Sequence, residues 1–313
     1  MRYLSETNEY VDAHTFERGL DTFVEGLLGR LSSVGSAASE LQDDWKLLRG
    51  ERNDLETAGR RKLEALLGCD PNEAPEETLK TLRSQESEAG ADAVEEVAAA
   101  AKTDAPNVLR SLVETSSSSP ARMRFHPTIE NGRMIHFVAP GDELPWQRAD
   151  DEAMRARTAW GLDPGPISNE KLADRLGIDQ SVLSEIPVHR SPFAAGYRTN
   201  GPDGEVRIAL RSKWQVGRRF ELMRLVADQL AAPGNDRLLP ATTARTDRQQ
   251  FQRAFAQEFL CPFEDIRNEL GQGTPPDEDI DEMAQRYEVS PLLIRTVLVN
   301  KGLLSREALG DAL

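Results

Sequence analysis

Apolar residues recur at helical spacing through most of the chain. The pattern is strongest over residues 219–230 and 249–260, where apolar side chains return every three or four positions. Pro233 and Gly234 follow the first stretch and Pro262 follows the second, and these residue types commonly end helices. The pattern therefore predicts two amphipathic helices, one over each stretch.

The N-terminal third of the chain shows the same periodicity. Apolar side chains return every three or four positions over residues 16–31, and after a break near Gly35 the pattern resumes at Leu41, Trp45 and Leu48. This spacing indicates a helical hairpin or a short coiled coil. The pattern predicts further helices over residues 76–82, 91–101 and 109–113. We expect this region to act in docking: to its own copy, to the C-terminal half of the chain or to a partner protein.

Two short stretches are predicted to be strands of a small sheet. They are residues 195–198 and 206–210, and the turn-forming sequence NGPDG at 200–204 lies between them. Residues 134–138 (MIHFV) are another candidate strand. The predicted fold is therefore α+β and mainly α.

A serine-rich stretch marks the clearest boundary in the chain. The sequence SSSSP at 116–120 is typical of a linker. A length of 313 residues allows two domains, or one domain with a helical extension. We therefore divide the chain into a helical N-terminal region (1–115), a linker with a short strand (116–145) and a C-terminal domain (146–313).

The net charge of −15 is unevenly distributed. Residues 1–120 carry 24 acidic and 13 basic side chains, whereas residues 206–254 carry ten basic and four acidic ones. The acidic balance of the whole chain disfavours general nucleic-acid binding, because that binding depends on neutralised phosphates. The local basic excess fits an anionic partner, or arginines that are solvated or paired within the chain.

Other features of the sequence indicate where in the cell the protein is located. The chain has no apolar run of 18 residues, and its first residues lack the basic and apolar regions of a signal peptide. Cys69 and Cys261 lie far apart and fit reduced, buried thiols. We therefore expect a cytoplasmic protein that does not associate with a membrane.

The two C-terminal helices carry the signature of a known family. Arg219 and Phe220 begin the first helix, and residues 254–262 read AFAQEFLCP. These positions resemble the ImmA/IrrE-like metallo-endopeptidases, whose first helix has the form R-F-x-x-A-H-E-x-x-H and whose second has the form E-x-E-A-N-x-F-A-x-x-L-L-M-P. The resemblance extends from about residue 150 to about residue 304. It implies a zincin-like domain with a small β-sheet and C-terminal helices, including a helix–turn–helix-like segment.

The zinc motif of that family is missing here. In the family, two histidines four residues apart hold zinc, and the glutamate after the first histidine activates water. The corresponding positions are Arg224, Leu225 and Asp228, and the candidate positions for the acidic third ligand hold Gln249 and Phe251. A protonated arginine has no lone pair for a metal. We therefore predict no catalytic residue and no zinc cofactor, with an Arg224–Asp228 ion pair across one helical turn.

These features favour a catalytically inactive ImmA/IrrE-like protein that works as a protein-binding or regulatory module. The resemblance implies a repressor-like or toxin-like partner and a role in mobile-element, stress or phage-defence regulation. The candidate partner-binding residues lie where the family has its active-site cleft: Arg219, Arg224, Asp228, Arg248 and Arg253. The N-terminal helices are also candidates for self-association.

One alternative function is a metallo-endopeptidase that cleaves a repressor-like protein. It would need a non-standard metal site, such as Asp228 together with His136 or His189. Zinc sites normally draw on three or more protein ligands, and this sequence shows no motif that supplies such a set.

A second alternative is a DNA-binding regulator that uses the C-terminal helix–turn–helix-like segment. The second helix of that segment offers Arg295 and Lys301 as its charges, which is little for reading base edges. Its apolar residues are expected to pack in the core: Leu292, Leu293, Val297 and Leu298.

Overall fold

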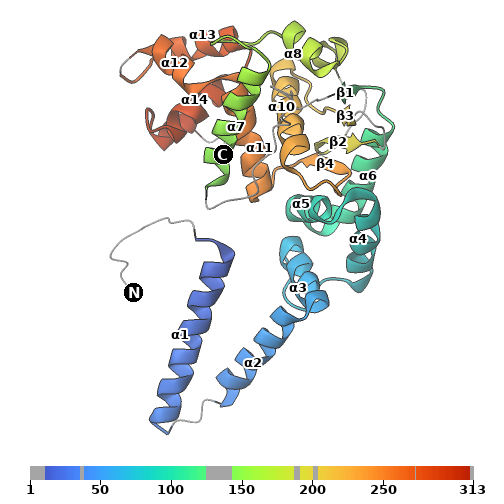
Figure 1. The fold of residues 1–313 in the computed structure, drawn as a ribbon, viewed down its shortest axis with the longest axis vertical. Helices are drawn as coiled ribbons and strands as arrows, with labels where there is room; N and C mark the ends of the chain where they lie inside the picture. Colours follow the sequence, from blue (N-terminus) through green and yellow to red (C-terminus); the bar gives the residue numbers. More distant parts are fainter. Residues whose placement is uncertain are drawn as a thin grey trace.

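The structure is a computed structural model that describes residues 11–35, 39–124, 143–186, 191–199, 204–271 and 273–310. It is mainly helical and contains one small sheet (Figure 1). The N-terminal half forms α1 (Ala13–Ser33), α2 (Ser39–Asn53), α3 (Leu55–Leu67), α4 (Glu76–Ala89), α5 (Ala91–Ala101), the 3-10 turn η1 (Lys102–Asp104) and α6 (Ala105–Ser117). The C-terminal half forms α7 (Pro145–Ala159), α8 (Asn169–Leu176), α9 (Ser181–Ser184), α10 (Gln215–Ala231), α11 (Asp247–Leu260), α12 (Phe263–Leu270), α13 (Asp277–Tyr287), α14 (Pro291–Asn300) and the 3-10 turn η2 (Arg306–Leu309).

The predicted mainly helical α+β class is confirmed by these elements. The helices expected over 219–230 and 249–260 correspond to α10 and α11, which extend a few residues further at their N-terminal ends. A threonine caps α11, since the side chain of Thr246 accepts a hydrogen bond from the backbone N–H of Gln249. None of the described helices combines the length and the apolar composition that crossing a bilayer requires.

The sheet has four antiparallel strands in the order β1-β3-β2-β4. They are β1 (Arg122–Arg124), β2 (Ala194–Arg198), β3 (Glu205–Ala209) and β4 (Leu238–Ala241). The predicted pairing of β2 with β3 is confirmed, with Ala195 opposite Ala209. The candidate strand at 134–138 lies outside the described residues. Strand β4 was not predicted; it is an edge strand, a position that tolerates Pro240.

The two faces of the sheet are covered by different helices. Val206, Ile208 and Leu239 face one core, which they share with α10 and α11. Ala195 and Tyr197 face a second core, formed with α3, α4, α5 and α6. Successive side chains of a strand point to opposite faces, so one short sheet can serve both cores. The sheet is therefore the middle layer between two groups of helices (Figure 1).

Residues 116–124, at the start of the segment predicted as a linker, belong to the folded body. Ser116 and Ser117 belong to α6, and the Ser119 hydroxyl donates a hydrogen bond of 2.6 Å to the carbonyl oxygen of Ile208. Strand β1 then joins the sheet. Because α5 contacts β4 and α6 contacts β2 and β3, the helices α3 to α6 and the C-terminal half share a core. The hairpin of α1 and α2 instead extends away from this body (Figure 1).

Candidate functional site

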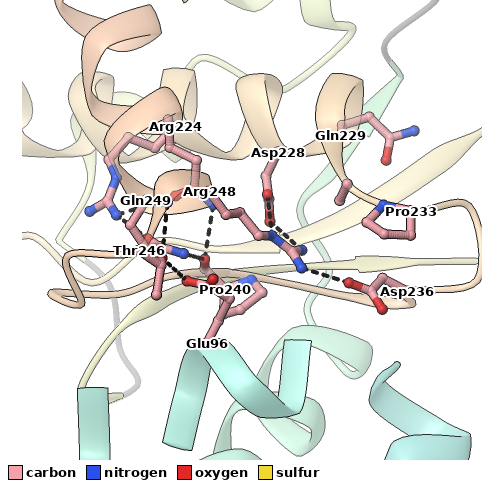
Figure 2. A network of polar contacts seen from close by, with 12 residues as sticks. Glu96, Arg224, Asp228, Gln229, Pro233, Asp236, Pro240, Thr246, Arg248 and Gln249 are labelled. Atoms are coloured by element: carbon pink, nitrogen blue, oxygen red, sulfur yellow. Dashed lines mark hydrogen bonds and ion pairs between the residues drawn. The ribbon is translucent and has the colours of Figure 1, made fainter. Parts of the chain in front are cut away.

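Polar side chains meet in a buried cluster between α10, α11, β4 and α5 (Figure 2). Helix α10 brings in the positions where the resembled family has its zinc motif, and α11 brings in the second-helix positions. We define the buried polar cluster as Glu96, Arg224, Asp228, Asp236, Thr242, Thr246, Arg248, Gln249 and Gln252. Its hydrogen bonds form two networks, one around Arg224 and one around Arg248, whose α11 residues Gln249 and Arg248 are adjacent in the sequence.

The first network is centred on the guanidinium of Arg224. Its Nη2 donates to the carbonyl oxygen of Thr242 at 2.7 Å, and also to the side-chain oxygens of Gln249 and Gln252. Both glutamines are themselves held, because each donates from Nε2 to the carbonyl oxygen of Pro240. Arg224 is only 8% exposed, and burial, with Arg253 nearby, lowers its pKa to about 10. The side chain therefore stays charged at neutral pH.

The second network is centred on Arg248, which bridges two buried carboxylates. Its Nε and Nη2 donate to the two oxygens of Asp228 at 2.7 and 2.9 Å, a bidentate pair. Its Nη1 donates to Asp236 at 2.6 Å. Burial opposes the charge on Arg248, but the two carboxylates outweigh that effect and raise its pKa above the ordinary value. This bridge ties α10, α11 and the segment before β4 together.

A residue of α5 extends the cluster from the other side of the sheet. Glu96 accepts a hydrogen bond of 2.6 Å from the Thr246 hydroxyl, at the N-cap of α11. Burial raises the pKa of Glu96, although the hydrogen bond from Thr246 and the charge of Arg248 act in the opposite direction. The N-terminal helices therefore contact the region where the resemblance placed a cleft.

The structure corrects the predicted Arg224–Asp228 ion pair. Although the two residues lie one turn apart on α10, Arg224 points toward Thr242 and the glutamines, whereas Asp228 pairs with Arg248 (Figure 2). The reason is that α11 offers each side chain a better-placed partner: glutamine oxygens for Arg224 and the guanidinium of Arg248 for Asp228. The residues that complete both networks had not been assigned a role in the site from the sequence: Glu96, Asp236, Thr242, Thr246 and Gln252. No short motif marks them, because loops and a second helix layer bring them in.

The residues at these positions do not fit a zinc ion. Arg224 offers protonated nitrogens, Leu225 is fully buried and apolar, and Asp228 is occupied by Arg248. Among the second-helix positions, Gln249 is bound to Arg224, and Phe251 packs its ring against Phe255. Within the described residues there is no group of three His, Cys, Asp or Glu side chains that could hold a metal. His136 and His189 lie outside the described residues.

The predicted partner-binding surface is not exposed. Arg219 and Asp228 are 0% exposed, Arg224 is 8% exposed and the side chain of Arg248 is 12% exposed. Arg253 is half-buried and donates to the carbonyl oxygen of Ala244 at 3.0 Å. These side chains are buried or half-buried and bond to other parts of the chain, so they do not form the predicted exposed recognition surface.

Arg219 lies on α10 outside the buried polar cluster and has different hydrogen-bond partners. It donates to the carbonyl oxygen of Ile167 at 2.6 Å and to Glu288 at 3.0 Å, and it also bonds the side chain of Asn169. Burial lowers its pKa to about 10. The side chain thereby links α10 to the start of α8 and to the end of α13.

The C-terminal helix–turn–helix-like segment is built from α13 and α14. Leu293, Val297 and Leu298 are buried as expected, whereas Leu292 is 42% exposed, contrary to its expected core position. Its basic side chains are paired with carboxylates: Arg286 with Glu269 at 2.8 Å, Arg295 with Asp277 at 2.9 Å and Lys301 with Asp150 at 2.7 Å. Because these basic side chains are paired, the segment offers less positive charge to bind the phosphate backbone of DNA.

Comparison with known proteins gives no further guide to the class of this protein. No model of a known protein family matches the chain, and neither the curated proteins nor the solved structures contain a match.

Proposed function

We propose that this chain is a catalytically inactive, ImmA/IrrE-like protein with a zincin-like domain, and that it works by binding another protein. The observation that supports this proposal is the network around Arg224. A buried, charged guanidinium takes the place of the first metal ligand, and its acceptors are the backbone of Thr242 and two glutamines. The resemblance suggests a repressor-like or toxin-like partner, in mobile-element, stress or phage-defence regulation.

The partner surface is expected near the start of α10. The basic stretch of residues 206–254 contains the buried arginines, but just before α10 it has two exposed side chains, Lys213 and Trp214. Trp214 is 76% exposed. Tryptophan is enriched among the residues that dominate binding energy at protein interfaces. An exposed tryptophan beside a lysine fits a partner with an apolar pocket and acidic residues around it.

Metal analysis tests the loss of the peptidase chemistry. The full chain, purified without chelator and then dialysed against equimolar zinc, should keep far less than one zinc per chain. It should also show no hydrolysis of fluorescent casein that a chelator removes. About one zinc per chain, together with chelator-sensitive hydrolysis, would overturn the proposal and favour the metallo-endopeptidase alternative.

Affinity capture from the native host tests the binding role. The wild-type chain should enrich a second protein, and Trp214→Ala should weaken its binding by about 30-fold, as expected for a central tryptophan. Leu55→Ala is the matched control, because Leu55 is 90% exposed but lies at the start of α3. If no second protein is enriched above a tag-only control, the binding role fails.

A further inference from the structure

Helix α1 presents a stripe of large apolar side chains to solvent. Phe16 is 63% exposed and Phe23 is 68% exposed, and Leu20 and Leu27 are 38% and 37% exposed. The spacing of these residues is four, three and four, which places them on one face of the helix. Monomeric proteins rarely leave such a contiguous face uncovered.

An adjoining side of α1 already packs against α2. Val24 is the buried residue of this helix, and ion pairs link α1 to α2: Glu25 with Arg49 at 2.8 Å and Asp21 with Arg52 at 2.9 Å. The stripe is therefore a second face of α1, and α2 does not cover it. On α2, Leu41 and Leu48 flank the buried Trp45 at four- and three-residue spacing and are also exposed, which extends the apolar surface of the hairpin.

We propose that the stripe on α1 packs against the same stripe of a second copy of this chain, with the two helices antiparallel. The pattern is self-complementary in this orientation. Phe16 of one copy lies opposite Leu27 of the other, and Leu20 lies opposite Phe23, so that each layer pairs one large ring with one smaller side chain. A two-fold axis between residues 21 and 22 relates the two copies, as is usual for homodimers.

The area of the surface suits a stable dimer when the second copy also covers the exposed Leu41 and Leu48 of α2. The exposed parts of Phe16, Leu20, Phe23 and Leu27 together with those two leucines amount to roughly 600 Å² per copy, or about 1,200 Å² in the pair, above the ~1,000 Å² expected of a specific interface. Two glycines, Gly19 and Gly26, border the stripe seven residues apart. A Cβ added at either would meet no atom of the same chain within 4 Å. Their bare backbone leaves room for a second helix to approach.

The shape of the molecule favours the antiparallel orientation. The hairpin extends away from the rest of the chain, with the start of α1 and the end of α2 nearest the body (Figure 1). Antiparallel pairing of α1 places the two bodies at opposite ends of the joined hairpins. Parallel pairing would bring both bodies to the same end, where they compete for space.

Sedimentation velocity on the full chain tests the dimer. The wild type should sediment as a species of twice 34.7 kDa at micromolar concentration. Phe23→Glu, which places a charge in the interface twice per dimer, should raise the dissociation constant by at least about 100-fold. The matched control is Leu47→Glu: Leu47 is 66% exposed but lies two residues beyond Trp45, on the opposite side of α2, so the dimer should persist.

Three outcomes would overturn the proposal: a monomeric wild type at 100-fold higher concentration, a dimer that survives Phe23→Glu, or a dimer that Leu47→Glu disrupts equally. Circular dichroism of both variants checks that helix content is kept. Whether the chain retains zinc does not affect the sedimentation result, so the proposed function and the proposed dimer can fail independently.

A distance measurement tests the orientation. A spin label at the exposed Ser33, introduced as Ser33→Cys in a Cys69→Ser background, should give a distance of about 35 Å between copies, from a rise of about 1.5 Å per residue on each side of the two-fold axis. A parallel pair would give a distance below about 20 Å, because equivalent residues then lie side by side. That shorter distance would refute the antiparallel arrangement.

Discussion

Replacing Arg248 by methionine should unfold the protein at a markedly lower temperature. Arg248 is the ion-pair partner of Asp228 and Asp236, which are 0% and 1% exposed, and its removal leaves both carboxylates in the interior without that ion pair. Breaking a buried ion pair by removing one partner costs about 3–5 kcal/mol. With about 2–4 °C per kcal/mol for a protein of this size class, the melting temperature should fall by roughly 6–20 °C.

The assay is thermal unfolding followed by circular dichroism at 222 nm. Arg245→Met is the matched control, because Arg245 is an exposed arginine just before the same helix, and its loss should cost less than about 0.5 kcal/mol. Adding Asp228→Leu to Arg248→Met should recover part of the loss, since an apolar pair needs no charge partner. A melting temperature within about 2 °C of the wild type for Arg248→Met would refute the reasoning.

The sign of the pH dependence gives a second check on Arg248→Met. Burial already raises the pKa of Asp236, and removal of the arginine should raise it further. A carboxyl group with a raised pKa in the folded state stabilises that state at low pH and loses this effect as the pH rises. The variant should therefore be closest to the wild type near pH 5 and furthest from it near pH 8.

Two other residues give predictions of the same kind. Burial, with Asp150 nearby, raises the pKa of Glu258 from 4.5 to about 7, so the free energy of unfolding should fall by about 2.5 kcal/mol between pH 5 and pH 8. Denaturant unfolding across that range should show the fall, and Glu258→Gln should remove it; an unchanged slope in the variant would contradict the assignment. Gly90→Ala should cost about 2 kcal/mol or more in the same assay, because φ is +103° and a Cβ would lie 2.1 Å from Oδ1 of Asp236. Gly68→Ala, also at positive φ but with its nearest atom at 3.9 Å, should cost less, and equal losses would show that backbone strain alone is responsible.

The sequence predicts the long helices and the β2–β3 hairpin because each has a local signal. The apolar periods and the prolines bound α10 and α11, and a turn sequence joins the two strands. Strand β4 (LLPA) has no alternation and contains a proline, so no local rule marks it. The covering of the second sheet face by α5 and α6 was also missed, since the apolar period of a helix does not say which neighbour it meets.

The candidate site also has a part that the sequence predicts and a part that it does not. The positions of Arg224 and Asp228 follow from helical spacing on α10. Their partners do not, because Thr242 contributes a backbone carbonyl and Asp236 lies in the segment between α10 and β4. Which arginine is buried also depends on tertiary packing: Arg219 is fully buried, whereas Arg245, in the same basic stretch, is exposed.

The network around Arg224 also constrains how this sequence can change over evolutionary time. A histidine at position 224 would strand the carbonyl of Thr242 and the side-chain oxygen of Gln252, both now bonded to the guanidinium, and Gln249 would keep only its bond from the backbone N–H of Thr242. Each single substitution toward a metal site would therefore lower stability before any metal could bind. The positions are epistatic, because a metal ligand at position 224 is tolerated only if the glutamine partners of the arginine change with it.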